Sequence, residues 1–380
     1  MKGHFRKRGD KWYFWAELGT DGDGKRQQVS RGGFRTRREA EAAFAAIRDE
    51  LRKGTFVSET KTTVKEFLVD EWLPAIRVSI RPSTLDNYTS AMKRYVVPRI
   101  GGRQLDRVTP AMLNALYADL LATGRAGGLD GLSPKTVKEV HTILHKALHD
   151  AVRWGRLGRN PADLADPPAA RSPEMQVWSA EQLRKFLKSV EGDRLYAMWL
   201  MYATTGMRRG EVLGLRWRDV DHKHGRIAVV QSLLIVEHKM MFSEPKTNKG
   251  RRSVALDPTT AGVLRSHRAA QAQEQLLAGE VWTNSGLVFT TELGGPIDPQ
   301  RVTRNFGALS EEAGLPHIRL HDVRHSYASA ALAAGVPAKV VSERLGHASV
   351  SFTLDTYSHV LPAMQEDAAG KIAALILGTI

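Results

Sequence analysis

The chain contains no cysteine among its 380 residues. Disulfide bonds, thiolate nucleophiles and cysteine-ligated zinc sites are therefore excluded. This absence removes a large group of enzyme mechanisms, because any chemistry that the protein performs must use other side chains.

Long apolar runs are absent as well. No run reaches the roughly 18 apolar residues that a membrane-spanning helix needs, and the first ten residues, MKGHFRKRGD, have no apolar core behind their charges. The sequence therefore predicts neither a membrane span nor a secretory signal peptide, and we expect a cytoplasmic protein with no membrane partner. The composition, 42% hydrophobic and 25% charged, is typical of a globular chain, and the length allows two or three domains.

Positive charge is in excess and is unevenly spread. The formal net charge is +14, and residues 1–165 hold 30 Lys and Arg against 19 Asp and Glu. A basic bias of this kind favours binding to phosphate backbones, although charge also serves solubility.

The first 60 residues have the pattern of a small sheet followed by a helix. Residues 11–18 and 27–34 are typical of strands that are separated by a Gly- and Asp-rich turn. The sequence from Thr36 to Glu39 is a capping box, which predicts an Ala-rich helix that ends near Lys53.

From residue 62 to residue 160 the pattern becomes helical, with four amphipathic stretches. Ser83, Thr109 and Ser133 are candidate N-caps, and a proline follows each of the last two at the first helical position. Residues 160–173 are rich in proline and have no period, which is typical of an interdomain linker.

Three histidines, His141, His145 and His149, form a row on one face of the last of these helices. Metal binding is an alternative there, but no carboxylate lies in phase with the row. A row that flanks the apolar stripe of a core helix is the simpler interpretation.

The sequence HDVRH places His321 and His325 one helical turn apart, as in zinc proteases, and Glu343 or His347 could supply a third ligand. Against a metal, Arg324 lies on the same face and cannot lose its proton. A planar guanidinium beside an imidazole suits a phosphodiester instead, because it matches phosphate oxygens while the imidazole exchanges a proton.

Five motifs, each in the order and spacing of one family, extend this set. They are TTGMRRGEVLGLRW with Arg208, EPKTNKGRR with Lys246, LHDVRHSYAS with His321 and Arg324, RLGHAS with His347, and TLDTYSHV with Tyr357. Together, over residues 178 to 361, they resemble the tyrosine recombinases, and the first 165 residues are similar to the arm-binding and core-binding domains of phage-type integrases.

The resemblance implies a multidomain α+β fold. Residues 1–60 form an arm-type DNA-binding domain with a small three-stranded sheet plus helix, and residues 61–165 an all-α core-binding domain. A linker spans residues 166–177. Residues 178–380 form a mainly α catalytic domain with a small antiparallel sheet and a C-terminal tail.

The resemblance also implies the chemistry. Tyr357 attacks the scissile phosphate and forms a 3′-phosphotyrosine, so neither ATP nor any other cofactor or metal is required. Arg208 and Arg324 hold the non-bridging oxygens. Lys246 is the general acid, with Lys249 as the alternative.

The two remaining members of the catalytic set are histidines. His321 acts as the base toward Tyr357, and His347 donates a hydrogen bond to the phosphate. Three supporting residues lie behind this set, namely Glu211, Asp322 and His325. The residues expected to contact DNA are Arg6, Lys7, Arg8, Lys11, Lys25, Arg26, Arg31, Lys339 and Arg344.

We therefore expect a site-specific recombinase, the integrase of a phage or integrative element. Its partners are double-stranded DNA with core-type and arm-type sites, further copies of the chain in a tetramer, and an excisionase or host DNA-bending protein. The alternatives are a type IB topoisomerase and a non-catalytic DNA-binding regulator. Residues 370–380 are apolar for an exposed tail, and we hypothesise that they dock on a neighbouring subunit.

Overall fold

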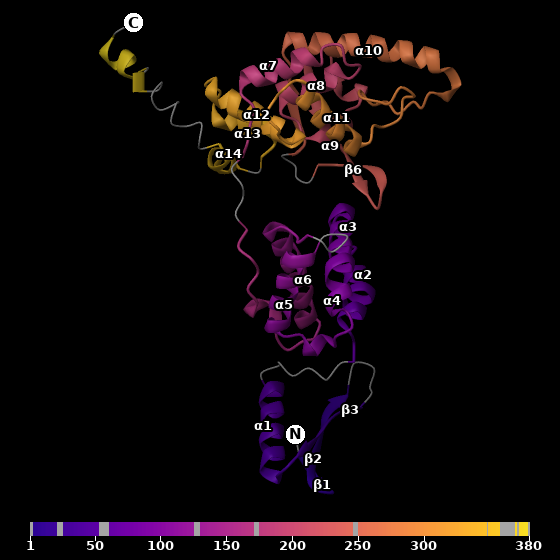
Figure 1. Cartoon of the computed structure of the whole chain (residues 1–380), viewed down its shortest axis with the longest axis vertical. Coiled ribbons are helices and arrows are strands. Elements are labelled where there is room, and N and C mark those ends of the chain that lie inside the picture. Colours follow the sequence, from indigo (N-terminus) through magenta and orange to yellow (C-terminus); the bar gives the residue numbers. More distant parts are fainter. Residues whose placement is uncertain are drawn as a thin grey trace. The chain divides into compact units, whose positions relative to one another are not determined.

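The computed structural model describes residues 3–20, 26–52, 61–124, 130–170, 175–245, 250–347, 349–357, 369–370 and 372–378. The chain divides into two compact units, Met1–Ser172 and Pro173–Ile380 (Figure 1). In the described part of the chain, every helix is too short or too polar to cross a membrane.

The first unit begins with an antiparallel sheet of three strands in the order β1-β2-β3, covered by one helix. The elements are β1 (Gly3–Arg8), β2 (Lys11–Thr20), β3 (Arg26–Phe34) and α1 (Arg37–Arg52). Phe14, Phe44 and Ile47 form the centre of the small core between sheet and helix. Thr36 accepts a hydrogen bond from the Glu39 amide at 3.2 Å, so the helix begins where the capping sequence predicts.

The rest of the first unit is helical, as predicted. It contains α2 (Leu73–Ile76), α3 (Pro82–Ala91), α4 (Val97–Ile100), α5 (Pro110–Thr123) and α6 (Pro134–Arg153), the π-helical segments Glu66–Trp72 and Met92–Val96, and the 3₁₀ turns Leu105–Arg107 and Pro161–Leu164. Its core is one apolar cluster around the fully buried Trp72, whose indole Nε1 donates to the buried carboxylate of Asp150 at 2.9 Å. That hydrogen bond ties the first helix of the domain to α6.

Both π-helical segments have the same cause. Each ends two residues before a proline, Pro74 in one case and Pro98 in the other. A proline inside a helix has no amide hydrogen and its ring clashes with the carbonyl four residues earlier. A locally wider turn removes that clash and lets the helix continue through the proline.

The predicted helix starts are confirmed at two of three positions. Thr109 and Ser133 each accept a hydrogen bond from the amide three residues later. Ser83 is wrong as an N-cap, because the helix already begins at Pro82 and Arg81 precedes it in an extended conformation. The fixed φ of proline suits the first helical position.

The segment expected to be a linker is partly folded. Asn160 caps the short Pro161–Leu164 turn and donates from its amide to the His145 carbonyl at 3.1 Å. The interpretation of residues 160–173 as a linker is therefore wrong at its start, since these first residues pack on α6. The pattern of prolines could not distinguish a packed 3₁₀ turn from an extended linker.

The second unit is mainly helical, with two small antiparallel sheets. The helices are α7 (Ala180–Ser189), α8 (Tyr196–Thr205), α9 (Arg209–Leu213), α10 (Pro258–Ala278), α11 (Pro299–Glu312), α12 (Leu320–Ala333), α13 (Ala338–Leu345) and α14 (Val350–Thr356). The strands are β4 (Val220–Asp221), β5 (Arg226–Val229), β6 (Ser232–Val236), β7 (Lys239–Ser243) and β8 (Arg252–Ala255).

The apolar stretch at residues 225–236 is divided between those two sheets. β5 lies between β4 and β8, whereas β6 pairs only with β7 in a hairpin. The chain leaves the first sheet at Gln231, whose side-chain amide donates to the Gly214 carbonyl at 2.7 Å. In chain order, β7 ends before the EPKTNKG sequence and β8 begins after it.

Candidate active site

The predicted catalytic side chains of the second unit come from separate elements. Arg208 lies at the start of α9, His321 and Arg324 on α12, His347 after α13, and Tyr357 at the end of α14. Lys246 and its alternative Lys249 lie outside the described residues.

Arg208 is held from behind by Glu211. The carboxylate of Glu211 accepts from the backbone amide of Arg208 at 2.9 Å and from its guanidinium Nη1 at 2.8 Å. Glu211 is 4% exposed whereas the Arg208 side chain is 41% exposed, so the guanidinium reaches the surface from a buried anchor.

A second arginine that sequence reasoning missed, Arg252, faces the same carboxylate. Its Nη2 and Nη1 donate to the two oxygens of Glu211 at 2.8 and 3.1 Å, and its Nε donates to the Arg344 carbonyl at 2.6 Å. The two arginines outweigh the desolvation of Glu211, and the pKa of this carboxyl falls to about 2. Period-two alternation in β8 places Arg252 on the inward side with Val254, and that signal could have identified it.

Arg324 is buried and is fixed by two carbonyl groups. Its Nη1 donates to the Gly206 carbonyl at 2.8 Å and its Nη2 to the Leu345 carbonyl at 2.7 Å. Gly206 has φ of +62° and ends α8, and a side chain there would collide with Tyr327 and Leu345. Burial and the charges of neighbouring arginines lower the pKa of Arg324 to about 9, still high enough for a cation at neutral pH.

Tyr357 is fully buried, and its hydroxyl is 2.7 Å from Nδ1 of His325. The aromatic ring packs among Leu332, Val341 and Leu345. Burial raises the pKa of the Tyr357 hydroxyl to about 12, with Arg324 acting in the opposite direction. His325 was expected only as a supporting residue, and of these two described histidines it is His325 and not His321 that contacts the tyrosine.

The other two histidines, His321 and His347, make separate contacts. The His321 ring is in edge contact with the His325 ring, at 5.2 Å between centroids. His347 is 9% exposed, and its Nδ1 is 2.8 Å from the Thr353 hydroxyl. Burial and then the charges of Arg324 and Arg208 lower the pKa of His347 to about 4, so this imidazole is neutral at pH 7.

Asp322, the third predicted supporting residue, is hydrogen-bonded to Arg319 at the start of α12. Its carboxylate accepts from the Arg319 amide at 2.9 Å and from the Arg319 guanidinium at 2.7 Å. Within the described residues, no group of three or more His, Asp or Glu side chains is arranged to hold a metal ion. The structure thus gives the HDVRH motif a capping acid and two histidines around an arginine.

Two histidines of the row on α6, His141 and His145, make contacts within the helical domain. His141 Nδ1 is 2.7 Å from the Tyr117 hydroxyl, and His145 Nε2 is 2.8 Å from the Asp163 carboxylate. His149 is exposed. The first two contacts tie α6 to α5 and to the Pro161–Leu164 turn.

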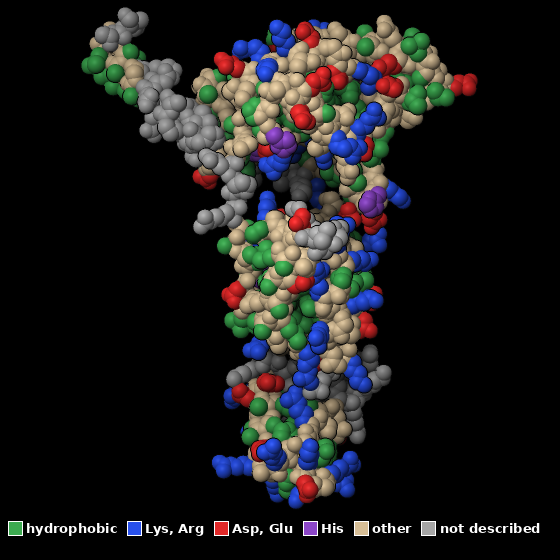
Figure 2. Space-filling view, in the orientation of Figure 1, with side chains coloured by type: hydrophobic (Ala, Val, Ile, Leu, Met, Phe, Trp, Pro, Cys, Tyr) green, Lys and Arg blue, Asp and Glu red, His purple; other side chains and the backbone are tan. Residues whose placement is uncertain are grey.

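The described cations expected to contact DNA lie on different faces of the N-terminal sheet and on α13 of the second unit. Arg6 pairs with Tyr13 and Arg8 with Lys11 across β1 and β2, on the face opposite the buried Phe14. Figure 2 shows Lys and Arg side chains gathered over this sheet. Tyr13 lies directly over Gly32, where any added side chain would be within 1.8 Å of its ring.

Lys7 and Arg31 are exposed but belong to the helix side of the sheet, because they stand opposite Trp12 and Phe14. In the second unit Lys339 is exposed on α13. Arg344 is anchored instead, with Nε 2.6 Å from the Tyr327 hydroxyl.

Two of the expected cations, Lys25 and Arg26, lie wholly or partly outside the described part of the chain. Lys25 lies outside the described residues. Arg26 begins β3, and its side chain is outside the described part.

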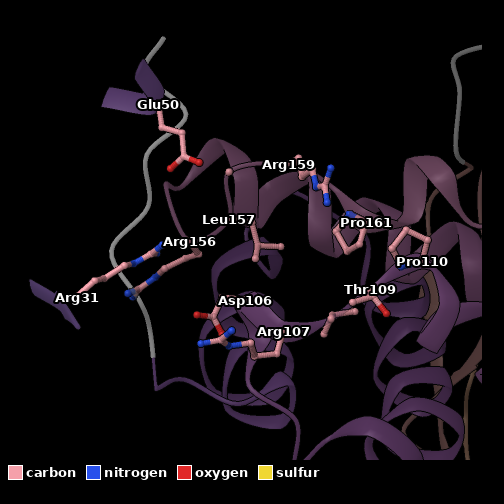
Figure 3. Close-up of a pocket in the computed structure, with 12 residues that line it drawn as sticks. Arg31, Glu50, Asp106, Arg107, Thr109, Pro110, Arg156, Leu157, Arg159 and Pro161 are labelled. Atoms are coloured by element: carbon pink, nitrogen blue, oxygen red, sulfur yellow. The ribbon is translucent and has the colours of Figure 1, made fainter. Parts of the chain in front are cut away.

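A polar hollow opens on the helical domain (Figure 3). Its wall includes Arg107, the last residue of the Leu105–Arg107 turn, and Arg156 and Arg159, which follow α6. Arg156 is paired with Glu71 at 2.9 Å. These cations add to the positive surface of the first unit, and sequence reasoning did not single them out.

Three family models match consecutive parts of the chain. The phage integrase family matches residues 176–364, an arm DNA-binding domain matches residues 4–51, and the N-terminal SAM-like domain of phage integrases matches residues 63–121. The fold is similar to the Tn1549 transposon integrase in complex with transposon right end DNA (TM-score 0.66, 21% identity, covering 81% of this chain and 99% of that one).

Two curated relatives cover almost the whole chain. A XerC-like tyrosine recombinase of Caldanaerobacter subterraneus subsp. tengcongensis is 30% identical over 99% of both chains. The ICEBs1 integrase of Bacillus subtilis is 26% identical and covers 90% of this chain and 91% of its own. The chain belongs to the tyrosine recombinase family and is a site-specific recombinase.

Proposed function

We propose that this chain is the integrase of a phage or integrative element, and that it cleaves DNA with the described site around Tyr357. The observation that carries the proposal is the placement of the Tyr357 hydroxyl, buried beside the charge of Arg324 and hydrogen-bonded to an imidazole. The buried Tyr117 makes a similar contact with His141, so the charge of Arg324 is what distinguishes the setting of Tyr357.

The proposed reaction is a phosphoryl transfer in two reversible steps. The Tyr357 oxygen forms a bond to phosphorus and gives its proton to a histidine of the HDVRH motif. The bond from phosphorus to the 5′-oxygen breaks, and Lys246 gives a proton to that oxygen. Arg208 and Arg324 stabilise the negative charge that develops on the non-bridging oxygens. His321 and His347 donate hydrogen bonds to the phosphate, and the free 5′-hydroxyl of a second strand later reverses the step.

Glu211 has a positioning role in this scheme. It is already neutralised by Arg252, so its ion pair with Arg208 fixes the geometry of that guanidinium without cancelling all of the local positive charge. The excess of cations over acids at the site is what a phosphodiester requires.

The partner that we propose is double-stranded DNA, bound in the cytoplasm. Solved structures of similar fold include a lambda integrase dimer bound to a core site and a lambda integrase tetramer bound to a Holliday junction. By analogy, we propose core-site binding and a tetramer for this chain. An excisionase or a host DNA-bending protein is part of the proposal as an accessory partner.

The exposed face of the N-terminal sheet is our candidate for the arm-type contact. Arg6, Arg8 and Lys11 share that face with the rings of Tyr13 and Trp15, and Trp15 stacks on His4 at 5.2 Å. Two antiparallel strands fit the width of a DNA major groove, and the cations can then reach phosphates on its borders.

A nicked substrate that traps the covalent intermediate tests the function. Wild-type protein mixed with candidate attachment-site DNA should form an adduct that resists denaturant, and Tyr357→Phe should bind the DNA equally well without forming it. An adduct with the Phe variant would refute the nucleophile. Relaxation of supercoiled DNA of any sequence would favour a type IB topoisomerase, and binding without any adduct in the wild type would favour a regulator.

A further inference from the structure

The contact between His325 and Tyr357 assigns a role that the motif alone does not. His325 Nδ1 lies 2.7 Å from the Tyr357 hydroxyl, and the two rings are 5.8 Å apart at an angle of 51°. One residue comes from α12 and the other from the end of α14. Both elements are fixed by the apolar cluster that contains Tyr357.

We propose that His325, and not His321, accepts the proton of the Tyr357 hydroxyl when that oxygen attacks phosphorus. This inference rests on the proposed function, since it concerns the same cleavage step. The atoms balance as follows: the tyrosine oxygen joins phosphorus, its proton moves to His325 Nδ1, and the 5′-oxygen leaves with a proton from Lys246. In ligation His325 returns the proton to the tyrosine.

The imidazole is in the state that accepting a proton requires. Burial first, then the neighbouring His321, lowers the pKa of His325 to about 4, so the ring is neutral at pH 7 and one nitrogen is free to accept. The charged and titratable groups around it are His321, Asp322, Arg324 and Arg319 from its own helix region, His347 after α13, and Tyr357 at the end of α14.

Binding of substrate improves His325 as a base. The scissile phosphate places a negative charge between Arg208 and Arg324, and this charge offsets the arginines that disfavour a protonated imidazole. Proton transfer thus becomes easier at the moment when the phosphate is in place. In the protein without DNA the same contact keeps the tyrosine neutral and oriented.

His321 is placed for a different task. It is one helical turn before His325, it touches that ring by its edge, and its own side chain is exposed. Its pKa is lowered by desolvation and by Arg324, so it is a neutral donor that can contact a phosphate oxygen. Of the two histidines of HDVRH, His325 therefore acts on the nucleophile and His321 contacts the phosphate.

The test compares matched amide variants of the two histidines. Cleavage rates of His325→Gln and His321→Gln on the nicked substrate are measured from pH 6 to pH 10, with DNA binding and thermal unfolding as folding controls. His325→Gln should cleave about 10²- to 10⁴-fold more slowly at pH 7, the range typical of a lost general base. Its rate should rise about tenfold per pH unit, because hydroxide must then make the phenolate.

His321→Gln should keep the pH profile of the wild type, whatever its loss of rate. A His325→Gln rate within tenfold of the wild type, or the steep pH profile appearing in His321→Gln instead, would overturn the assignment. If His325→Gln is unstable, His325→Ala with added imidazole provides the second measurement: recovery of adduct supports the assignment and no recovery in folded protein opposes it. Absence of any adduct in the wild type would refute the proposed function itself.

Discussion

Arg252 and Glu211 form a buried, two-point ion pair directly behind Arg208, with distances of 2.8 and 3.1 Å. Arg252 is 6% exposed and Glu211 4%, so the pair is closed to solvent. Arg252 also donates to the carbonyls of Arg344 and Gly250. A single guanidinium thereby joins β8, the start of α9 and the end of α13.

Removing this guanidinium should reduce both stability and cleavage. Arg252→Met leaves the Glu211 carboxylate buried and less compensated, and we expect a loss of about 3–5 kcal/mol in the free energy of unfolding. Chemical denaturation measures the loss. In the folded fraction, Arg208 should be pulled toward Glu211 and cleavage should fall at least tenfold.

The matched control is Arg194→Met, which breaks the half-buried pair of Arg194 with Glu274 in the same unit. It should destabilise the protein and leave cleavage per folded molecule unchanged. Equal cleavage by folded Arg252→Met and Arg194→Met would remove Arg252 from the functional site.

Acid should destabilise the protein partly through Glu211. Its pKa is about 2 in the folded chain against an ordinary 4.5, so it contributes stability that is fully present above the unfolded pKa and is lost as pH falls toward 2. The pKa difference corresponds to roughly 3 kcal/mol. Unfolding curves between pH 6 and pH 2.5 should show a smaller loss for Glu211→Gln than for the wild type, and parallel curves would contradict this.

The sheet face of the first unit should determine salt-dependent DNA binding. Arg6→Ala and Arg8→Ala should weaken binding and each reduce the slope of log affinity against log salt by about one, as for a lost phosphate contact. Lys7→Ala is the control, because Lys7 stands on the helix side opposite Trp12. The measurement is a DNA titration from about 50 to 200 mM salt. Equal losses of affinity for Lys7→Ala and Arg6→Ala would contradict DNA binding by this face of the sheet.

Residues 370–380 should matter for assembly and not for cleavage. Ile372, Leu375, Ile376 and Leu377 are exposed on the described part of this segment, with Leu375 84% exposed. Burial of such side chains on a neighbouring subunit is favourable. A chain without these residues should cleave single-site DNA normally and fail to hold two sites together in a gel-shift or sedimentation measurement; unchanged synapsis would refute the docking hypothesis.

Much of the fold could be predicted from local signals. The capping box at Thr36, the caps at Thr109 and Ser133, and the change from strand to helix patterns depend on neighbours within one or two turns. Predictions failed where a residue distant in sequence determines the local conformation. At Asn160, predicted to begin a linker, the side-chain amide donates to the His145 carbonyl and holds the segment on α6. The wider turns before Pro74 and Pro98 could have been anticipated from proline alone.

The sequence by itself determined the family, because the motifs around Arg208, Arg324 and Tyr357 are recognised by their residue types, order and spacing alone. Only the tertiary structure decided that His325 meets Tyr357, across 32 residues, and that Arg252 meets Glu211, across 41. The physical reason is that spacing along a helix tells which residues share a face, whereas the packing of α12 on α14 and of β8 on α9 selects the side chain that each one contacts.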